Sequence, residues 1–123
     1  MKYTLISWAS RVDSIKTSTI SLETALEEIR SGKYRDRVER VRIAFKQGVK
    51  KDAGPLKRKL PAILFSGCFS ERNDEGIEQH SGILVADLDE LGAVRLPELR
   101  AKLKEDPYVI FVFLSPTSSG LKV

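Results

Sequence analysis

The sequence predicts an α/β (α+β) fold, a single domain whose mixed sheet contains a βαβ unit flanked by helices. Two observations lead to this class. Apolar residues recur at helical spacing in two stretches, 22–29 and 34–45, while two nearly unbroken apolar runs, 82–89 (GILVADLD) and 108–114 (YVIFVFL), have the composition of buried strands. A helix predicted over 96–106 joins the two runs, so we expect parallel strands linked by a right-handed crossover.

The composition limits the class of protein. The chain has 123 residues, the usual size of one domain, which we assign to residues 1–123. No apolar run approaches the roughly 18 residues of a membrane span, and the N-terminus lacks the apolar core of about 7–15 residues of a signal peptide. We therefore expect a cytoplasmic protein with no membrane association. With one Cys and one His, the chain contains no Cys/His zinc site, so carboxylates would have to hold any catalytic metal.

The first elements follow from local signals. Residues 3–8 alternate weakly and are rich in strand formers, which predicts an opening strand, and residues 11–19 are polar and loop-like. Ser21 is a favourable N-cap for the helix that follows, and Gly32 is a favourable C-cap for its end.

Basic residues concentrate in the middle of the chain. A second helix is predicted over 35–47, and KKDAGPLKRK (50–59) reads as a turn-rich basic connector. Residues 30–59 carry 12 basic and 3 acidic side chains, a net charge of +9. Such a segment suits a polyanion such as nucleic acid; the alternative is a solvated helix face followed by a Lys-rich loop. The expected nucleic-acid contacts are Lys57, Arg58 and Lys59.

The second half alternates between apolar runs and polar loops. Residues 62–66 predict a short buried strand, and residues 67–79 are polar, with a loop tip expected at 72–76. After the strand over 108–114, SPTSSG (115–120) predicts a tight loop, and residues 121–123 begin a further apolar run that should start another strand.

Asp87 and Asp89 form the first candidate site. Residues i and i+2 of a strand point to the same face, so the two carboxylates should lie side by side at the C-terminal end of a buried strand. Ligands in open α/β sheets bind at that end. Mg²⁺ takes oxygen ligands, usually one or two carboxylates plus substrate phosphates, so the pair is a candidate Mg²⁺ or Mn²⁺ site. The alternative is an ordinary strand end followed by a turn.

The loop SPTSSGLK (115–122) is the second candidate. Small hydroxyl residues and glycine let backbone N–H groups approach a phosphate closely, and Lys122 adds a cation. The spacing of a P-loop is absent. The alternative is an ordinary Ser/Pro/Gly turn.

Several ordered blocks together resemble the VirE N-terminal domain family (virulence-associated protein E), over about residues 21–123. The blocks are LPA…FSG, HSG leading into the D-x-D strand, the DPY strand, and the Ser-Pro-x-x-x-Gly-Leu-Lys loop. That family is in turn similar to the archaeo-eukaryotic primase, or primase–polymerase, superfamily. In that superfamily a strand ending in D-x-D holds metal, and a Ser-Gly-type loop ending in His contacts the incoming nucleotide. Here Lys122 stands at the His position, and Ser118 stands where the loop usually has Gly.

The resemblance implies a primase-like nucleotidyltransferase domain, or the N-terminal part of one, from a phage or mobile-element replication protein. Asp87 and Asp89 would be the catalytic, metal-binding pair. The implied nucleotide-phosphate contacts are Ser118, Ser119, Gly120 and Lys122. The implied ligands are DNA and a nucleoside triphosphate, and the implied partner is a helicase in cis or in trans. The alternatives are a non-catalytic nucleic-acid-binding module that targets an appended helicase, and a degenerate remnant.

The resembled families take a third acidic residue from a later strand. We therefore expect these 123 residues alone to lack polymerase activity. An open sheet edge or exposed apolar surface would also favour self-association.

Overall fold

The computed structural model describes residues 4–48 and 50–123, with the side chains of residues 50–52 left out of the description. The fold class is confirmed as α+β, with helices and antiparallel sheets. The chain forms two compact units, Met1–Leu84 and Val85–Val123, called here the N-terminal unit and the C-terminal unit. No helix in the described stretches is long and apolar enough to cross a membrane.

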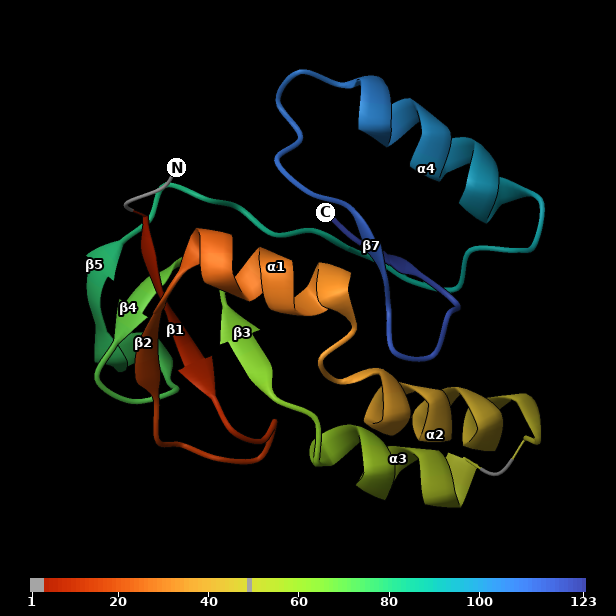
Figure 1. Ribbon diagram of the computed structural model, residues 1–123, viewed down its shortest axis with the longest axis horizontal. Helices are drawn as coiled ribbons and strands as arrows, with labels where there is room; N and C mark the ends of the chain where they lie inside the picture. The colour runs from red at the N-terminus through yellow and green to blue at the C-terminus, as the bar shows by residue number, and fades with distance from the viewer. Residues whose placement is uncertain (1–3, 49) are drawn as a thin grey trace. The chain divides into compact units, whose positions relative to one another are not determined.

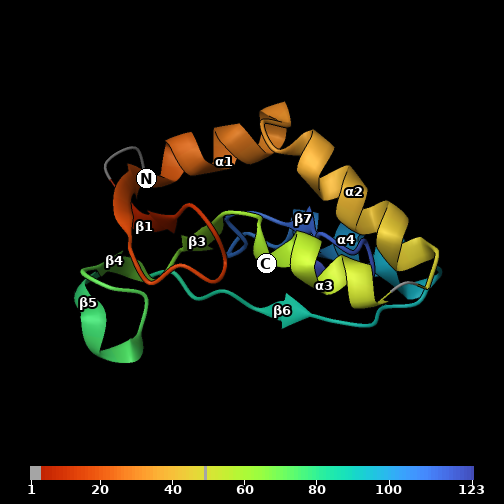
Figure 2. The same cartoon turned by 90° about the horizontal axis from the view of Figure 1, so that it is seen from below.

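A three-stranded antiparallel sheet organises the N-terminal unit. Its strands are β1 (Leu5–Ala9), β2 (Ser18–Ser21) and β3 (Ala62–Leu64), in the order β2-β1-β3. Helix α1 (Leu22–Ser31) lies across one face of this sheet (Figures 1 and 2). The opening strand is confirmed, whereas β2 occupies the end of the stretch 11–19 that was expected to be loop, because pairing with β1 orders it.

The caps of α1 are those that the sequence predicts. The Ser21 hydroxyl accepts a hydrogen bond from the Thr24 N–H at 3.1 Å, and Gly32 adopts the left-handed conformation at φ 77°. Leu22 and Ala25 of the helix are buried in the core. Local signals at the two ends therefore set the length of this helix.

Helices α2 (Arg35–Lys46) and α3 (Lys50–Arg58) pack against each other as a pair (Figures 1 and 2). The helix expected over 35–47 is confirmed, but the connector expected over 50–59 is wrong, since most of it is α3. Pro55 lies inside α3 and cannot donate a backbone hydrogen bond there. Packing against α2 stabilises the helix in spite of this, because tertiary contacts override propensity. The buried side chains of the pair are Val41, Ala44 and Ala53.

A hairpin occupies the polar stretch over 67–79, and the loop tip expected at 72–76 lies between its two strands. Strands β4 (Gly67–Phe69) and β5 (Ile77–His80) pair antiparallel around the short 3₁₀ helix η1 (Asp74–Gly76). The fully buried Ser7 hydroxyl in β1 accepts a hydrogen bond from the Phe69 N–H at 2.8 Å, which ties the hairpin to the sheet. Polar strands of this kind lack the apolar alternation by which a strand is recognised in a sequence.

The C-terminal unit consists of a second three-stranded sheet and one helix. The strands are β6 (Asp87–Leu88), β7 (Phe113–Leu114) and β8 (Leu121–Lys122), and α4 (Arg95–Glu105) follows β6. Both β6 and β7 pair antiparallel with β8, in the order β6-β8-β7. The two strands of the expected βαβ unit thus run in the same direction, but β8 separates them, and the described ladders are antiparallel rather than mixed.

The two apolar runs are strands over only part of their expected length. Residues 82–89 contribute β6 alone and residues 108–114 contribute β7 alone. Leu84 is 90% exposed and Tyr108 is 93% exposed, so the expectation of buried strands is wrong there. The physical reason is that β8, the strand with which both runs pair, is only two residues long. A reciprocal pair of backbone hydrogen bonds between Ala86 and Val123 extends its pairing with the first run.

Candidate functional site

The β6–β8 ladder places Lys122 directly opposite Asp87. The two residues are partners in the antiparallel register, and the Lys122 Nζ lies 2.7 Å from the Asp87 Oδ1. The Lys122 side chain is 34% exposed and the Asp87 side chain 55% exposed, so a ligand can reach both. Two residues 35 positions apart in the sequence, both proposed for the same site, therefore meet in the fold.

The loop over 115–120 is closed by its own hydrogen bonds. The Ser115 N–H donates to the Gly120 carbonyl at 3.0 Å, and the Ser118 N–H donates to the Ser115 carbonyl at 2.9 Å. The Gly120 N–H donates to the Ser115 hydroxyl at 3.1 Å. Ser118 has φ 61°, a left-handed conformation at the turn of the loop.

These bonds decide which amides can receive a phosphate. The sequence suggested that backbone N–H groups of residues 118–120 would do so, but Ser118 and Gly120 already donate within the loop. The Ser119 N–H forms no hydrogen bond with any described residue. Ser119 is therefore the amide of this stretch that is free to bind a phosphate oxygen.

The same loop packs closely on the end of β6. A Cβ atom at Gly120 would overlap the Leu88 carbonyl oxygen and lie 3.2 Å from the Asp89 Cα. The Leu91 N–H donates to the Ser119 carbonyl at 2.8 Å. Only glycine permits this approach, which brings the loop next to the two aspartates.

The carboxylates alone make a weak metal site. Within the described residues there is no group of three or more His, Cys, Asp or Glu side chains that could hold a metal ion. Asp87 has the Lys122 ammonium as its partner, and the exposed Asp89 forms no ion pair with a described side chain. Mg²⁺ is commonly bound by one or two carboxylates together with substrate phosphates. Asp87 lies in β6 and Asp89 follows the strand, so an ion held by one or both carboxylates would need further ligands, such as substrate phosphates.

A second feature lies in the N-terminal unit, where cationic side chains meet in a groove of about 480 Å³. Lys59, at the end of α3, is one of the three nucleic-acid contacts predicted from the sequence, and it lines this groove. Lys57 and Arg58 lie in the last turn of α3 and are not among its lining residues. The groove is lined by Ser10, Arg11, Arg37, Arg40, Leu56 and Lys59.

Residues 55–123 match the family model described as "BT4734-like, N-terminal domain". The chain belongs to this family. Neither the comparison with curated proteins nor the comparison with solved structures found a match. The matched part of this BT4734-like domain includes Asp87, Asp89 and the loop over 115–122.

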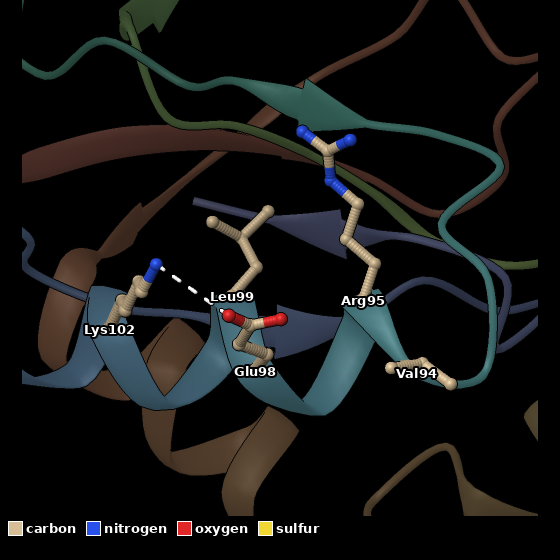
Figure 3. Close-up of a pocket in the computed structure, with 5 residues that line it drawn as sticks. All are labelled: Val94, Arg95, Glu98, Leu99 and Lys102. Carbon is tan, nitrogen blue, oxygen red and sulfur yellow. Dashed lines mark ion pairs between the residues drawn. The ribbon is translucent and has the colours of Figure 1, made fainter.

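Another hollow of the BT4734-like domain, of about 430 Å³, runs along α4 and takes no part in either feature. Leu99 and Arg95 point to the same side of the helix, and Glu98 pairs with Lys102 at 3.7 Å (Figure 3). These residues come from one exposed helix and its first turn, so the hollow has no converging groups for chemistry. It is lined by Val94, Arg95, Glu98, Leu99 and Lys102.

Sequence reasoning missed three arginines of the basic groove. The charge of the segment 30–59 gave a signal for Arg37 and Arg40, but not for their common position beside Lys59. Arg11 lies outside that segment, in the loop between β1 and β2, so only the fold of the BT4734-like domain reveals it.

Proposed function

We propose that this BT4734-like domain is a primase-like, nucleotidyltransferase-type domain, or the N-terminal part of one, that binds a nucleoside triphosphate together with a divalent cation. One observation carries the proposal: the Lys122 Nζ lies 2.7 Å from the Asp87 Oδ1, with the Ser119–Gly120 loop packed on the end of the same strand. Every nucleotide contact expected from the sequence lies within this one unit.

The chemistry follows from the donor set. A bound Mg²⁺ or Mn²⁺ ion neutralises phosphate charge and activates an attacking hydroxyl. Asp87 and Asp89 would be the catalytic, metal-holding carboxylates. Lys122 would donate to a phosphate oxygen, and the Ser119 N–H to a second one, while the small residues of the Ser118–Gly120 turn let the phosphates come close.

The wider setting is also a proposal. We propose that the domain acts in the cytoplasm on DNA, beside a helicase in cis or in trans, as the resemblance to the VirE N-terminal family implies. The exposed apolar side chains of Val94 and Tyr108 support self-association. Since the described residues hold no third carboxylate at the site, we expect this chain to bind nucleotide without synthesising primers.

Removing both aspartates should weaken cation-dependent nucleotide binding. We expect calorimetric titration of ATP to show binding with Mg²⁺ or Mn²⁺ and none with EDTA. In Asp87→Asn/Asp89→Asn the affinity should fall by about tenfold or more, the equivalent of one lost contact to a charged group. Glu98→Gln/Glu105→Gln removes two exposed carboxylates from α4 and serves as the matched control. Equal binding by both double variants would refute the site.

The basic groove supports a second candidate, a non-catalytic nucleic-acid-binding module. This function needs the cations of the N-terminal unit and neither aspartate. Two measurements distinguish the two candidate functions. If the wild type binds no ATP, and if Asp87→Asn/Asp89→Asn binds nucleic acid as tightly as the wild type does, the domain is a nucleic-acid-binding module.

A further inference from the structure

The basic groove gathers cations from three separate parts of the N-terminal unit. Arg11 lies in the β1–β2 loop, Arg37 and Arg40 lie one turn apart on α2, and Lys59 follows α3. The loop that bears Arg11 is held to the end of α3, because the Val12 N–H donates to the Leu60 carbonyl at 2.8 Å. The backbone thus holds the elements that bear these cations around one groove.

Three of the four cations lack an acidic partner. Arg11 pairs with Asp13 at 3.0 Å. Arg40 and Lys59 form no ion pair with a described side chain, and neither does Arg37, whose guanidinium lies 5.9 Å from the centre of the Tyr34 ring. That cation–π contact orients Arg37 without neutralising it. Like charges held together repel one another, so a ligand with several negative charges should bind here.

We propose that this groove binds the sugar–phosphate backbone of single-stranded nucleic acid through Arg37, Arg40 and Lys59. A single phosphate would leave part of this charge unneutralised, whereas successive phosphates of one strand can meet one cation each. A groove of about 480 Å³ is too small to enclose a duplex. Arginine suits the task because its planar fork donates two hydrogen bonds to one phosphate.

The lining also sets the specificity. Of the described residues that line the groove, none is aromatic, so bases have no stacking platform of the kind that single-strand-binding proteins use. The contacts therefore involve the backbone, and binding should be independent of base sequence and strongly dependent on salt. This inference deepens the nucleic-acid part of the proposed function and does not need the Asp87 site.

The test is fluorescence anisotropy of a labelled oligothymidylate of about 20 nucleotides, titrated with the full chain over a salt series in EDTA. Arg37→Gln/Arg40→Gln/Lys59→Gln should lower the log–log salt slope by about 2 and the affinity about 100-fold, since each single-strand phosphate contact contributes about 0.7 to the slope. Arg30→Gln/Lys46→Gln/Lys104→Gln removes the same charge from exposed positions outside the groove and should have a much smaller effect. An equal loss in both variants would overturn the proposal.

Two further comparisons keep the test independent of folding defects. Arg37→Lys/Arg40→Lys retains the charges and should keep most of the salt slope. Lys59→Gln and Lys104→Gln each remove one exposed lysine, and only the first, which lies in the groove, should weaken binding. Equal affinity for inorganic tripolyphosphate, poly-glutamate or a duplex of the same length would also contradict a single-strand site. EDTA removes the divalent cations that the proposed Asp87 site needs. These results therefore do not depend on whether nucleotide binds at that site.

Discussion

Gly120→Ala should lower the free energy of unfolding of the C-terminal unit by about 1–3 kcal/mol, the usual cost of overpacking. The added Cβ would overlap the Leu88 carbonyl oxygen, a backbone atom that cannot rotate away as a side chain does. Relief requires β8 or the loop over 115–120 to move away from β6. The same movement would separate Lys122 from Asp87, so nucleotide binding should weaken together with stability.

Gly92→Ala provides the matched control for this substitution. A Cβ at Gly92 would have no neighbour within 4 Å, so alanine there should be neutral or stabilising by up to about 1 kcal/mol. Urea denaturation followed by circular dichroism measures both variants, and amide hydrogen exchange at Leu121 and Lys122 locates the loss. Unchanged stability of Gly120→Ala would show that the loop is not packed on β6 as described.

Lys122→Met should reduce the affinity for the cation–nucleotide pair by about 10–100-fold, since a hydrogen bond to a charged group contributes about 1.5–3 kcal/mol. Under the proposed function the ammonium, which lies 2.7 Å from Asp87, also donates to a phosphate. If Lys122 served only to neutralise Asp87, its removal would free the carboxylate and strengthen cation binding. The two accounts therefore predict opposite signs.

Calorimetric titration of ATP in the presence of Mn²⁺ shows whether the substitution lowers or raises the affinity. Lys122→Arg keeps the charge and a donor opposite Asp87, so it should retain most of the affinity. Tighter nucleotide binding by Lys122→Met would assign Lys122 to the ion pair alone.

Helix ends could be predicted from the sequence because their signals are local. Ser21 and Gly32 bracket α1 as expected, and each acts on atoms within a few residues. Helix α3 could not be predicted, because Gly54 and Pro55 are typical of turns and only packing against α2 overrides them. The burial that stabilises α3 involves residues from another helix, which a local pattern does not contain.

Strands could be predicted only in part, because a strand exists through its partner. The run over 108–114 has strand composition throughout, yet only Phe113 and Leu114 pair with β8. The polar hairpin strands β4 and β5 show the converse, since they pair without an apolar pattern.

The candidate site, like the strands, could be predicted only in part. Asp87, Asp89 and the loop over 115–122 could be named from their residue types, but the opposition of Asp87 and Lys122 depends on a long-range register. The engagement of the Ser118 and Gly120 amides within the loop is likewise a property of the fold. In the basic groove, Lys59 could be named from the local charge, whereas Arg11 could not.

Under the proposed function, Asp87, Asp89 and the Ser118–Lys122 loop together hold a nucleoside triphosphate with its cation. Two-dimensional ¹H–¹⁵N NMR of the full chain, titrated with Mg²⁺ and a non-hydrolysable ATP analogue, tests it residue by residue. We expect the largest amide shifts at Ser119, whose N–H forms no hydrogen bond with a described residue, and smaller shifts at Gly120 and over residues 87–89. These shifts should require Mg²⁺. Shifts confined to the basic groove, or no shift at residues 87–89 and 118–122 at saturating nucleotide, would show that the nucleotide does not bind at this site.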